Sequence, residues 1–364
     1  MQIDFAITLF LIAYVIVILI VLFFVFQASR DQLFQEKPVS ILIPFRNEEP
    51  NLKNLVDSIV KLNLSKNSEI ILINDNSTDD SFEILENLRN QSNSPIRIVQ
   101  SPNEGKKSAI EFGVGYSGND VIITSDADCV FHPEWAVEHS KAYRKNQLTI
   151  GLVWIKNTSG VLASLQLLEQ IALNAFSIFF NKVKRPIYCS GANLSYDRET
   201  FIKLTPYTGN KHIASGDDYF ILKAFSDRGY SVKQLLNTKS FVYTEPVKSV
   251  KQLMNQKSRW IKKMILNSSY FGYGAIFSIL FYITFPILCL VFLSIGLISV
   301  KQFVTIVTIK FGIDYLFLFL VALKFKQAFG LIKTFVVQVI YPIYVLGVVL
   351  ISIFGEVNWK GRPI

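Results

Sequence analysis

Asp126 and Asp128 stand one residue apart, directly after the apolar run 121–123. Two carboxylates this close repel each other, so such a pair is normally solvated in a turn or held by a cation. One interpretation is a helix cap before a helix at 133–145, because acids cap helices more often than they bind ions. The other is a site for Mg²⁺ or Mn²⁺, in which one carboxylate binds the cation and a bound phosphate completes its shell.

Asp217 and Asp218 form a second acidic pair after Gly216. Repulsion between adjacent carboxylates raises the pKa of one of them, which suits a group that accepts a proton. The alternative is a helix N-terminus, where the helix dipole stabilises both acids. The residues alone favour neither interpretation.

The stretch 256–260 (QKSRW) places Gln256, Arg259 and Trp260 on one helical turn. An amide, a fixed cation and an indole together can bind a diphosphate and an acceptor at a membrane surface. The alternative is an interfacial helix whose tryptophan lies at the membrane boundary.

The elements that must position these residues alternate between short β-branched runs and helix-like segments. Such alternation predicts an α/β domain, a mostly parallel sheet with helices on both faces. Ligands bind outside the carboxyl ends of such strands, so four segments are expected along one edge of the sheet: 45–48, 75–77, 102–106 and 126–128. Strands are predicted at 39–44, 69–74, 96–100, 120–124 and 238–243, and helices near 48–63, 79–90, 105–117, 133–145, 160–182 and 250–271.

Lys106 and Lys107 stand where the third of these helices begins, after Gly105, and either could be the functional cation. A cation at a helix N-terminus can face an anionic ligand at the sheet edge, although a single lysine is more often solvated.

Composition points to a membrane protein, since 51% of the 364 residues are hydrophobic. Residues 5–26 are apolar, carry no charge and are long enough to cross a bilayer as a helix. Three further apolar stretches lie at 274–299, 303–323 and 331–354. The third stretch of the four contains Lys310 and Asp314, so either its neighbours shield this pair or one C-terminal segment does not fully span.

The net charge of +9 comes largely from lysines and arginines beside the apolar stretches. This distribution favours contact with membrane lipids and phosphate ligands, and no nucleic acid is expected as a partner. The positive-inside rule predicts a multi-pass protein of the inner or plasma membrane with its large domain in the cytoplasm. The three cysteines are few and unpatterned, which predicts free thiols.

The motifs occur in the order seen in family-2 glycosyltransferases of the GT-A fold, which the chain resembles over about residues 38–262. They are VSILIPFRNEEPNL, INDNSTDDS, NEGKKSAI, SDADCVFHPEW, GANLSYDRETF, SGDDYFIL and QKSRW. The resemblance includes the DxD and QxxRW motifs of the membrane-bound subgroup. The implied domains are an anchor at 1–30, a cytoplasmic GT-A domain at 38–249, an interfacial helix at 250–272, about three transmembrane helices at 273–355 and a basic tail at 356–364.

The resemblance implies a role for each matching residue. Pro44, Arg46 and Glu48 would border the nucleotide, and Asp75 would bind its base. The remaining assignments are Lys106 to the phosphates or sugar, Asp126 to the ribose or sugar, Asp128 to a divalent cation (Mg²⁺ or Mn²⁺), Asp218 to the general base, and Gln256, Arg259 and Trp260 to the diphosphate and acceptor.

Three departures from the family pattern affect these expectations. Asn74 replaces the first acid of a common Asp-Asp pair, and Gly216-Asp217-Asp218 replaces the more usual Glu-Asp, so the base is Asp217 if the register shifts by one. The chain also has fewer apolar segments than the large processive synthases.

The sequence therefore predicts a metal-dependent, inverting glycosyltransferase. Its expected donor is a nucleotide diphosphate sugar, with the family favouring UDP, and its acceptor is lipid-linked or membrane-embedded. The alternatives are a processive polysaccharide synthase and a non-catalytic membrane scaffold that retains the fold.

Overall fold

The computed structural model describes residues 2–28, 34–90, 95–156, 159–211, 213, 216–267, 270–327, 330–355, 358–359 and 362–363. The chain forms two compact units. We call residues 1–27, 157–179 and 246–357 the helical unit, and residues 28–156, 180–245 and 358–364 the sheet unit. Most of the predicted basic tail, 356–364, lies outside the described residues, as do residues 29 and 30 of the predicted anchor.

The sheet unit contains a seven-stranded sheet in the order β3-β2-β1-β4-β8-β6-β9. Six of these strands run parallel, and β8 is antiparallel to its neighbours β4 and β6. The prediction of a mostly parallel α/β sheet is therefore confirmed. The strands are β1 (Val39–Phe45), β2 (Glu69–Asn74), β3 (Ile96–Gln100), β4 (Val121–Thr124), β6 (Gln147–Gly151), β8 (Leu194–Asp197) and β9 (Ser231–Leu235).

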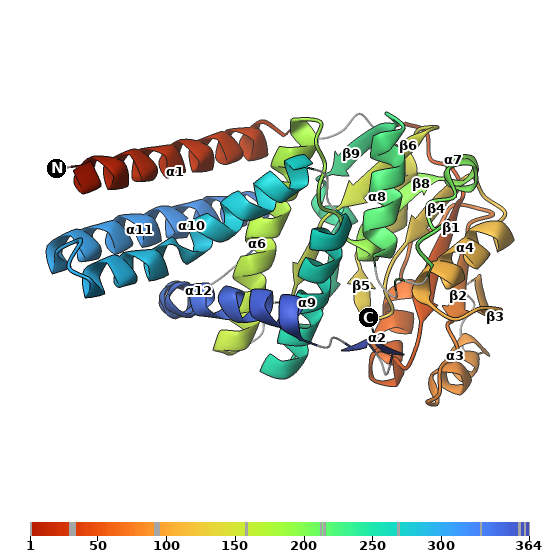
Figure 1. Cartoon of the computed structure of the whole chain (residues 1–364). Coiled ribbons are helices and arrows are strands. Elements are labelled where there is room, and N and C mark those ends of the chain that lie inside the picture. The colour runs from red at the N-terminus through yellow and green to blue at the C-terminus, as the bar shows by residue number, and fades with distance from the viewer. Residues whose placement is uncertain are drawn as a thin grey trace. The chain divides into compact units, whose positions relative to one another are not determined.

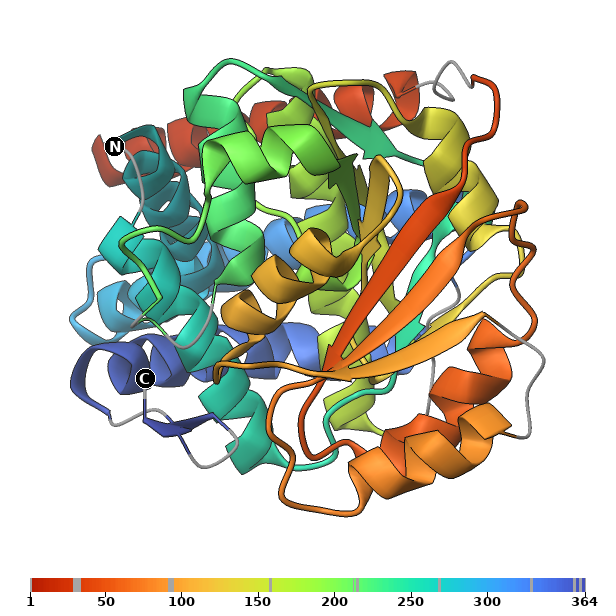
Figure 2. The same ribbon diagram turned by 90° about the vertical axis from the view of Figure 1, so that its right-hand side faces the viewer.

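Helices lie on both faces of this sheet, with α2 and α3 on one side of strands β1 to β3 and α4 on the other (Figures 1 and 2). A smaller sheet has the order β5-β10-β7, and β11 pairs with β12. The bounds are α2 (Glu49–Ile59), α3 (Ser81–Asn90), α4 (Lys106–Tyr116), α5 (Trp135–Ala142), η1 (Gly191–Asn193), α7 (Arg198–Leu204), α8 (Asp217–Asp227), η2 (Thr238–Ser240), β5 (Cys129–Phe131), β7 (Val153–Ile155), β10 (Val242–Thr244), β11 (Asn358–Trp359) and β12 (Arg362–Pro363).

The central strands are apolar on both faces because each face carries its own core. In β1, Ile41 and Ile43 pack in one core with Leu52 and Leu55 of α2. Leu42, which points to the opposite face, packs in the other core with residues of α4. Alternate residues of one short strand thus anchor a helix on each side.

The predicted strands in the first half are confirmed, whereas the second half was predicted less well. The periodicity of the sequence did not predict the strands β6, β8 and β9. The strand predicted at 238–243 is wrong for residues 238–240, which form η2, because the Asn237 side chain accepts a hydrogen bond from the Lys239 amide at 3.1 Å and starts a turn. Only residues 242–244 are a strand there.

The helical unit comprises α1 (Gln2–Gln27), α9 (Val250–Asn267), α10 (Tyr270–Ser294), α11 (Val300–Lys324) and α12 (Leu331–Phe354), together with most of α6 (Val161–Lys182). Within the described residues, four helices are long and apolar enough to cross a membrane: Ile7–Gln27, Val161–Lys182, Val300–Lys324 and Ile332–Phe354. For Val161–Lys182 the sequence predicts a helix, but not one that could cross a membrane. The predicted segment 274–299 is not among these four: its helix α10 ends at Ser294, and Ile283–Ser294 within it is a shorter apolar stretch. Ser299 instead caps α11 by accepting a hydrogen bond from the Gln302 amide at 3.2 Å.

The neighbouring helix α1 shields the charged pair Lys310 and Asp314 of α11. This is the first of the two alternatives that the sequence left open for this segment. Lys310 Nζ lies 2.6 Å from Asp314 Oδ2. The Tyr14 hydroxyl of α1 donates a hydrogen bond to Asp314 Oδ1, and Lys310 Nζ lies 5.5 Å from the centre of the Tyr14 ring. The tyrosine thus gives the second oxygen of this carboxylate a polar partner, in addition to the lysine that pairs with the first.

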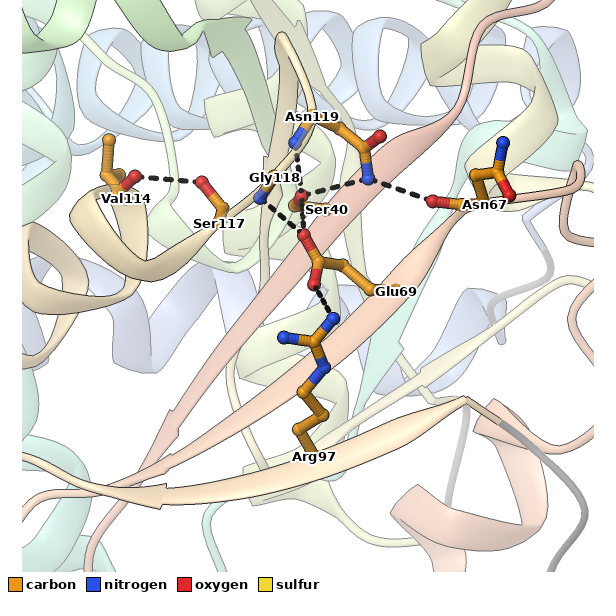
Figure 3. A network of polar contacts seen from close by, with 8 residues as sticks. All are labelled: Ser40, Asn67, Glu69, Arg97, Val114, Ser117, Gly118 and Asn119. Carbon is orange, nitrogen blue, oxygen red and sulfur yellow. Dashed lines mark hydrogen bonds and ion pairs between the residues drawn. The ribbon is translucent and has the colours of Figure 1, made fainter.

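Polar contacts fix the amino ends of the central strands (Figure 3). The buried Glu69 carboxylate of β2 accepts hydrogen bonds from Ser40 Oγ at 2.6 Å and from the Gly118 amide at 2.7 Å. Its second oxygen lies 2.9 Å from Arg97 Nη2 of β3, and Arg97 is more than half exposed. Glu69 therefore links β1, β2, β3 and the turn before β4.

We predict that Glu69→Ala destabilises the sheet unit by roughly 2–3 kcal/mol, because the Ser40 hydroxyl and the Gly118 amide lose their buried acceptor. Arg97→Ala is the matched control and should cost less than about 1 kcal/mol, since the Arg97 side chain is more than half exposed and the bonds of Ser40 and Gly118 to Glu69 remain. Hydrogen exchange of the β1 and β2 amides measures both effects. Equal exchange rates in the two variants would contradict this role of Glu69.

Candidate active site

Arg46 and Asp75 lie together at the carboxyl edge of the main sheet. Asp75 follows β2 and is buried, and its Oδ1 accepts a hydrogen bond from the Gly105 amide at 2.6 Å. Arg46 follows β1, and its Nη1 donates to the backbone oxygens of Asp75 at 2.8 Å and Asn76 at 2.7 Å. Three loops at this edge are therefore joined by two side chains that the sequence had singled out.

Pro44 and Glu48 lie on either side of this contact. Pro44 is buried within β1, opposite Ile73 of β2. Glu48 precedes α2; its amide donates to Ser81 Oγ at 2.9 Å, and its Oε2 accepts from Asn51 Nδ2 at 2.8 Å. Hydrogen bonds thus hold both the backbone and the carboxylate of Glu48 at this edge of the sheet.

Lys106 joins both acidic clusters. Its Nζ lies 2.6 Å from Asp126 Oδ1 and 2.9 Å from Asp217 Oδ2. Burial opposes the charge on Lys106, but the two carboxylates outweigh it and hold the pKa of Lys106 well above its usual value. The neighbouring Lys107 is buried instead and donates to Asn210 O at 2.6 Å. Of the two lysines, Lys106 is the one at the edge.

Asp217 and Asp218 begin α8, which confirms that they occupy a helix N-terminus. Asp217 is buried beside Lys106. Burial raises the pKa of Asp217, while Lys106 acts in the opposite direction. Asp218 is partly exposed, and its Oδ1 accepts a hydrogen bond from the Tyr219 amide at 2.7 Å. The contact with Lys106 and Asp126 is therefore made by the first acid of the pair.

Asp128 does not cap the following helix, because α5 begins at Trp135 with Glu134 in the cap position. Its carboxylate accepts a hydrogen bond from Thr244 Oγ1 at 3.2 Å and a weak one from the Cys129 thiol at 3.4 Å. One side of Asp128 is open to solvent, but the surrounding protein partly desolvates it. This desolvation, together with the charges of Asp126 and Glu48, raises the pKa of Asp128 to about 6.

The charges around Asp128 fit a divalent cation. The charges of Asp126 and Glu48 disfavour the ionised form of Asp128, and a hard cation with oxygen ligands would relieve that repulsion. Among the described residues, no three acidic, histidine or cysteine side chains are grouped as a metal site. A cation held by Asp128 would therefore take most of its ligands from a bound molecule and water.

Gly191 is a site residue for which sequence spacing gave no specific signal. A side-chain carbon at this position would lie 2.5 Å from Asp217 Oδ2 and 3.2 Å from Lys106 Nζ. Only the absence of a side chain lets η1 approach this ion pair so closely.

A buried network supports η1 from behind. His139 Nε2 donates a hydrogen bond to Asn193 Oδ1, and His139 Nδ1 accepts one from Ser195 Oγ, each at 2.8 Å. Trp135 Nε1 also donates to Asn193 Oδ1 at 2.9 Å. Burial lowers the pKa of His139 to about 4, so its ring is neutral at neutral pH. The position of η1 is thereby fixed by an uncharged polar cluster.

Gln256, Arg259 and Trp260 lie on α9, which is part of the helical unit. Helix α9 is held there by Lys257 Nζ, 2.5 Å from Glu169 Oε2 of α6, and by Ser258 Oγ, which donates to Val348 O of α12 at 3.1 Å. Lys257 Nζ also lies 4.1 Å from the centre of the Trp260 ring.

Among the residues that the structure describes, no carboxylate pairs with Arg259 as Glu169 does with Lys257. The Arg259 side chain is partly buried, and its Nε has no hydrogen-bond partner among the described residues. Burial lowers the pKa of Arg259 to about 10, so the guanidinium stays charged at neutral pH. A charged, partly desolvated donor without an acid is suited to binding an anion.

Residues 40–205 match the sequence model of glycosyl transferase family 2. This family-2 region contains the Arg46–Asp75 contact, Lys106, Asp126 and Asp128. Asp217 and Asp218 lie beyond it in sequence, although Lys106 connects Asp217 to it in space.

Several similar proteins are named undecaprenyl-phosphate 4-deoxy-4-formamido-L-arabinose transferase. The protein from Proteus mirabilis (strain HI4320) is 38% identical over 99 residues, 26% of this chain and 30% of its own length. That from Photorhabdus laumondii is 28% identical over 215 residues, 56% of this chain and 66% of its own. The chain thus spans less than two thirds of the relatives it matches.

A mannosyltransferase from Pyrobaculum calidifontis, solved with GDP-Man and Mn²⁺, has a similar structure. The TM-score is 0.55 at 12% sequence identity, and the match covers 96% of this chain and 98% of the other. This likeness supports the predicted GT-A fold with apolar helices near the termini.

We predict that Gly191→Ala lowers the thermal midpoint of the purified protein, because the new methyl group displaces the Asp217 carboxylate from Lys106; overpacking of this kind costs roughly 1–3 kcal/mol. Gly115→Ala in α4 is the matched control, since a side-chain carbon there has nothing within 4 Å. A midpoint unchanged in both variants would show that the Gly191 approach does not constrain the site.

Proposed function

We propose that the protein is a membrane-bound glycosyltransferase that moves a sugar from a nucleotide diphosphate sugar to a lipid-linked acceptor. The observation that carries this proposal is the Lys106 ion pair, which joins an acid of the family-2 region to the acid pair that begins α8. The four helices long enough to span a membrane support membrane attachment. The relatives named for undecaprenyl phosphate support a lipid-linked acceptor.

On the donor side, Pro44, Arg46, Glu48 and Asp75 would border the nucleotide. Lys106 is already charged and lies at the edge, so it would turn toward the donor phosphates or sugar. Asp126, which would lose that partner, would then bind the ribose or sugar. The UDP preference follows from the family resemblance alone.

Asp128 would hold a Mg²⁺ or Mn²⁺ ion together with the donor diphosphate. When bound, this cation would neutralise charge that builds on the departing diphosphate. In the helical unit, Arg259 would bind the diphosphate or the acceptor, with Gln256 and Trp260 beside it on α9.

For a hydroxyl acceptor, we assign the general base to Asp218 and a positioning role to Asp217. The base must reach the acceptor proton, and Asp218 is the more exposed of the two, whereas Asp217 is buried against Lys106. The acceptor oxygen attacks the anomeric carbon, the bond to the diphosphate breaks, and the proton passes to the carboxylate. This single displacement inverts the anomeric centre.

A phosphate acceptor changes the demand on Asp218. The second pKa of a phosphomonoester is about 6, so at neutral pH its oxygen attacks without giving up a proton. The decrease in kcat when Asp218 is replaced therefore distinguishes a hydroxyl acceptor from a phosphate acceptor.

The full chain in detergent should be stabilised against heat by a nucleotide diphosphate sugar, and more strongly with Mn²⁺ present. Asp128→Asn should remove the Mn²⁺-dependent part of the shift, while Asp57→Asn on α2 serves as a control outside the site. No Mn²⁺-dependent shift with any sugar nucleotide would contradict the donor site.

Sugar-transfer assays test the catalytic roles. If Asp128→Ala and Asp218→Ala still transferred sugar, these acids would not be required for catalysis. A product ladder would indicate a processive synthase, and one added sugar a single transfer.

With a polyprenyl phosphate acceptor, Asp218→Asn should lower kcat less than about tenfold. With a hydroxyl acceptor the loss should reach about 10²–10⁴-fold, the usual contribution of a general base. Asp227→Asn at the far end of α8 is the matched control. Equal losses with both acceptors would exclude a general-base role for Asp218.

A further inference from the structure

Tyr196 of β8 is a buried tyrosine whose hydroxyl makes no hydrogen bond to the part of the chain that the structure describes. The side chain is 1% exposed, and its ring stacks on that of Phe201 with the two centres 5.1 Å apart. A buried hydroxyl normally has a partner, because burial without one is unfavourable. An unpaired phenol in a packed core therefore calls for an explanation.

A second buried tyrosine in the same core provides a comparison. The Tyr207 side chain is fully buried, and its hydroxyl donates a hydrogen bond to the backbone oxygen of Asp217 at 3.3 Å. Tyr196 and Tyr207 belong to one apolar core, which contains residues of the main sheet and of helices α4, α7 and α8. Of these two phenols, only that of Tyr207 already has a partner at the start of α8.

Tyr196 shares its core with the first turns of the two helices that begin with Lys106 and Asp217. Ala109 of α4 and Phe220 of α8 belong to this core, and each follows the charged residue of its helix by three positions. Burial raises the pKa of Tyr196 above its usual value, the charge of Asp217 raises it further, and the charge of Lys106 acts in the opposite direction. The charges of the ion pair therefore reach this phenol.

Asp217 depends on Lys106 for its charge balance. Asp217 Oδ2 lies 2.9 Å from Lys106 Nζ, and no other cation is within ion-pair distance of it in the described ranges of the chain. On another side, a side-chain carbon at Gly191 would lie only 2.5 Å from the same oxygen. In the proposed function, Lys106 turns toward the donor and leaves this carboxylate buried without a cation. A buried carboxylate without a partner is strongly destabilised, so this step requires a new hydrogen-bond donor.

We propose that Tyr196 is a positioning residue whose hydroxyl donates a hydrogen bond to Asp217 when Lys106 turns toward the sugar nucleotide. This inference rests on the proposed function, in which Lys106 leaves the acid. A phenol suits the exchange because it is neutral, and because its hydrogen turns about the C–O bond without moving the buried ring. The hydroxyl is thus available when the donor binds, and Asp217 keeps its place beside Asp218 at the start of α8.

Tyr196→Phe removes this hydroxyl and keeps the ring. In the ligand-free full chain in detergent, the thermal midpoint should stay the same or rise, because only an unpaired hydroxyl is lost. In calorimetry with Mn²⁺, the variant should bind a sugar nucleotide about tenfold more weakly, since the donor complex loses a hydrogen bond to a carboxylate. The probe is the sugar nucleotide that gives the wild type its largest Mn²⁺-dependent thermal shift. The KM for this donor should rise, while the KM for the acceptor stays the same.

Tyr207→Phe is the matched control for the change of one hydroxyl in this core. It removes a hydrogen bond that exists in the free protein. The thermal midpoint should therefore fall, and the affinity for the sugar nucleotide should stay the same.

A test without any ligand uses Lys106→Met, which removes the cation permanently. In this background the Tyr196 hydroxyl should already bind Asp217, so adding Tyr196→Phe should lower the thermal midpoint, which it does not do in the wild type. An effect of Tyr196→Phe with the same sign in both backgrounds would overturn the inference, whatever the protein binds.

The binding measurements separate this inference from the proposed function. Equal donor affinity in the wild type and in Tyr196→Phe would overturn the role of Tyr196 and leave the proposed function intact. A wild type that binds no sugar nucleotide would contradict the proposed function, and the inference with it.

Discussion

The ion pair of Lys106 with Asp126 and Asp217 is the interaction on which the candidate site depends. It joins the start of α4, the loop after β4 and the start of α8, three segments that are far apart in sequence. Two carboxylates close together would separate without a cation between them. One lysine therefore both assembles this edge and balances its charge, and any ligand that recruits the lysine must also compensate the two acids.

The surroundings allow little freedom to that lysine. Gly191 leaves no space for a side chain beside Asp217, and η1 is held from behind by Asn193, His139 and Trp135. The Asn193 side chain also donates to the backbone oxygens of Leu152 and Ser240, at 2.8 and 3.0 Å. A fully satisfied polar network of this kind has one preferred arrangement. The precision of the charged edge thus depends on neutral groups that never reach its surface.

The sequence predicted the parts of the fold that are governed by local pattern. Strands β1 and β2 are mainly apolar runs, and β3 is a short β-branched stretch, each followed by a helix, so their edge and the positions of Arg46, Asp75 and Lys106 could be inferred. Strands β6, β8 and β9 could not, because Gln147, Ser195 and Ser231 interrupt the pattern where the sheet is lined by polar groups. Spacing also could not show that Asp217, and not Asp218, faces Lys106, since adjacent acids at a helix start look alike in sequence. The close approach of Gly191 depends on long-range packing, which one glycine in a sequence does not reveal.

The contact of Tyr14 with Asp314 joins residues 300 positions apart in the chain. Further contacts connect the same two regions: Lys324 Nζ donates to the backbone oxygen of Phe26, and the rings of Phe10 and Phe285 stack with centres 3.7 Å apart. During synthesis, α1 is made before α11, so its polar partner Asp314 follows 300 residues later. At roughly 5–20 residues per second, the first helix waits on the order of 15–60 s for that partner. Assembly of the helical unit therefore has to wait for helices that are far apart in sequence, and it cannot be completed while only α1 has been made.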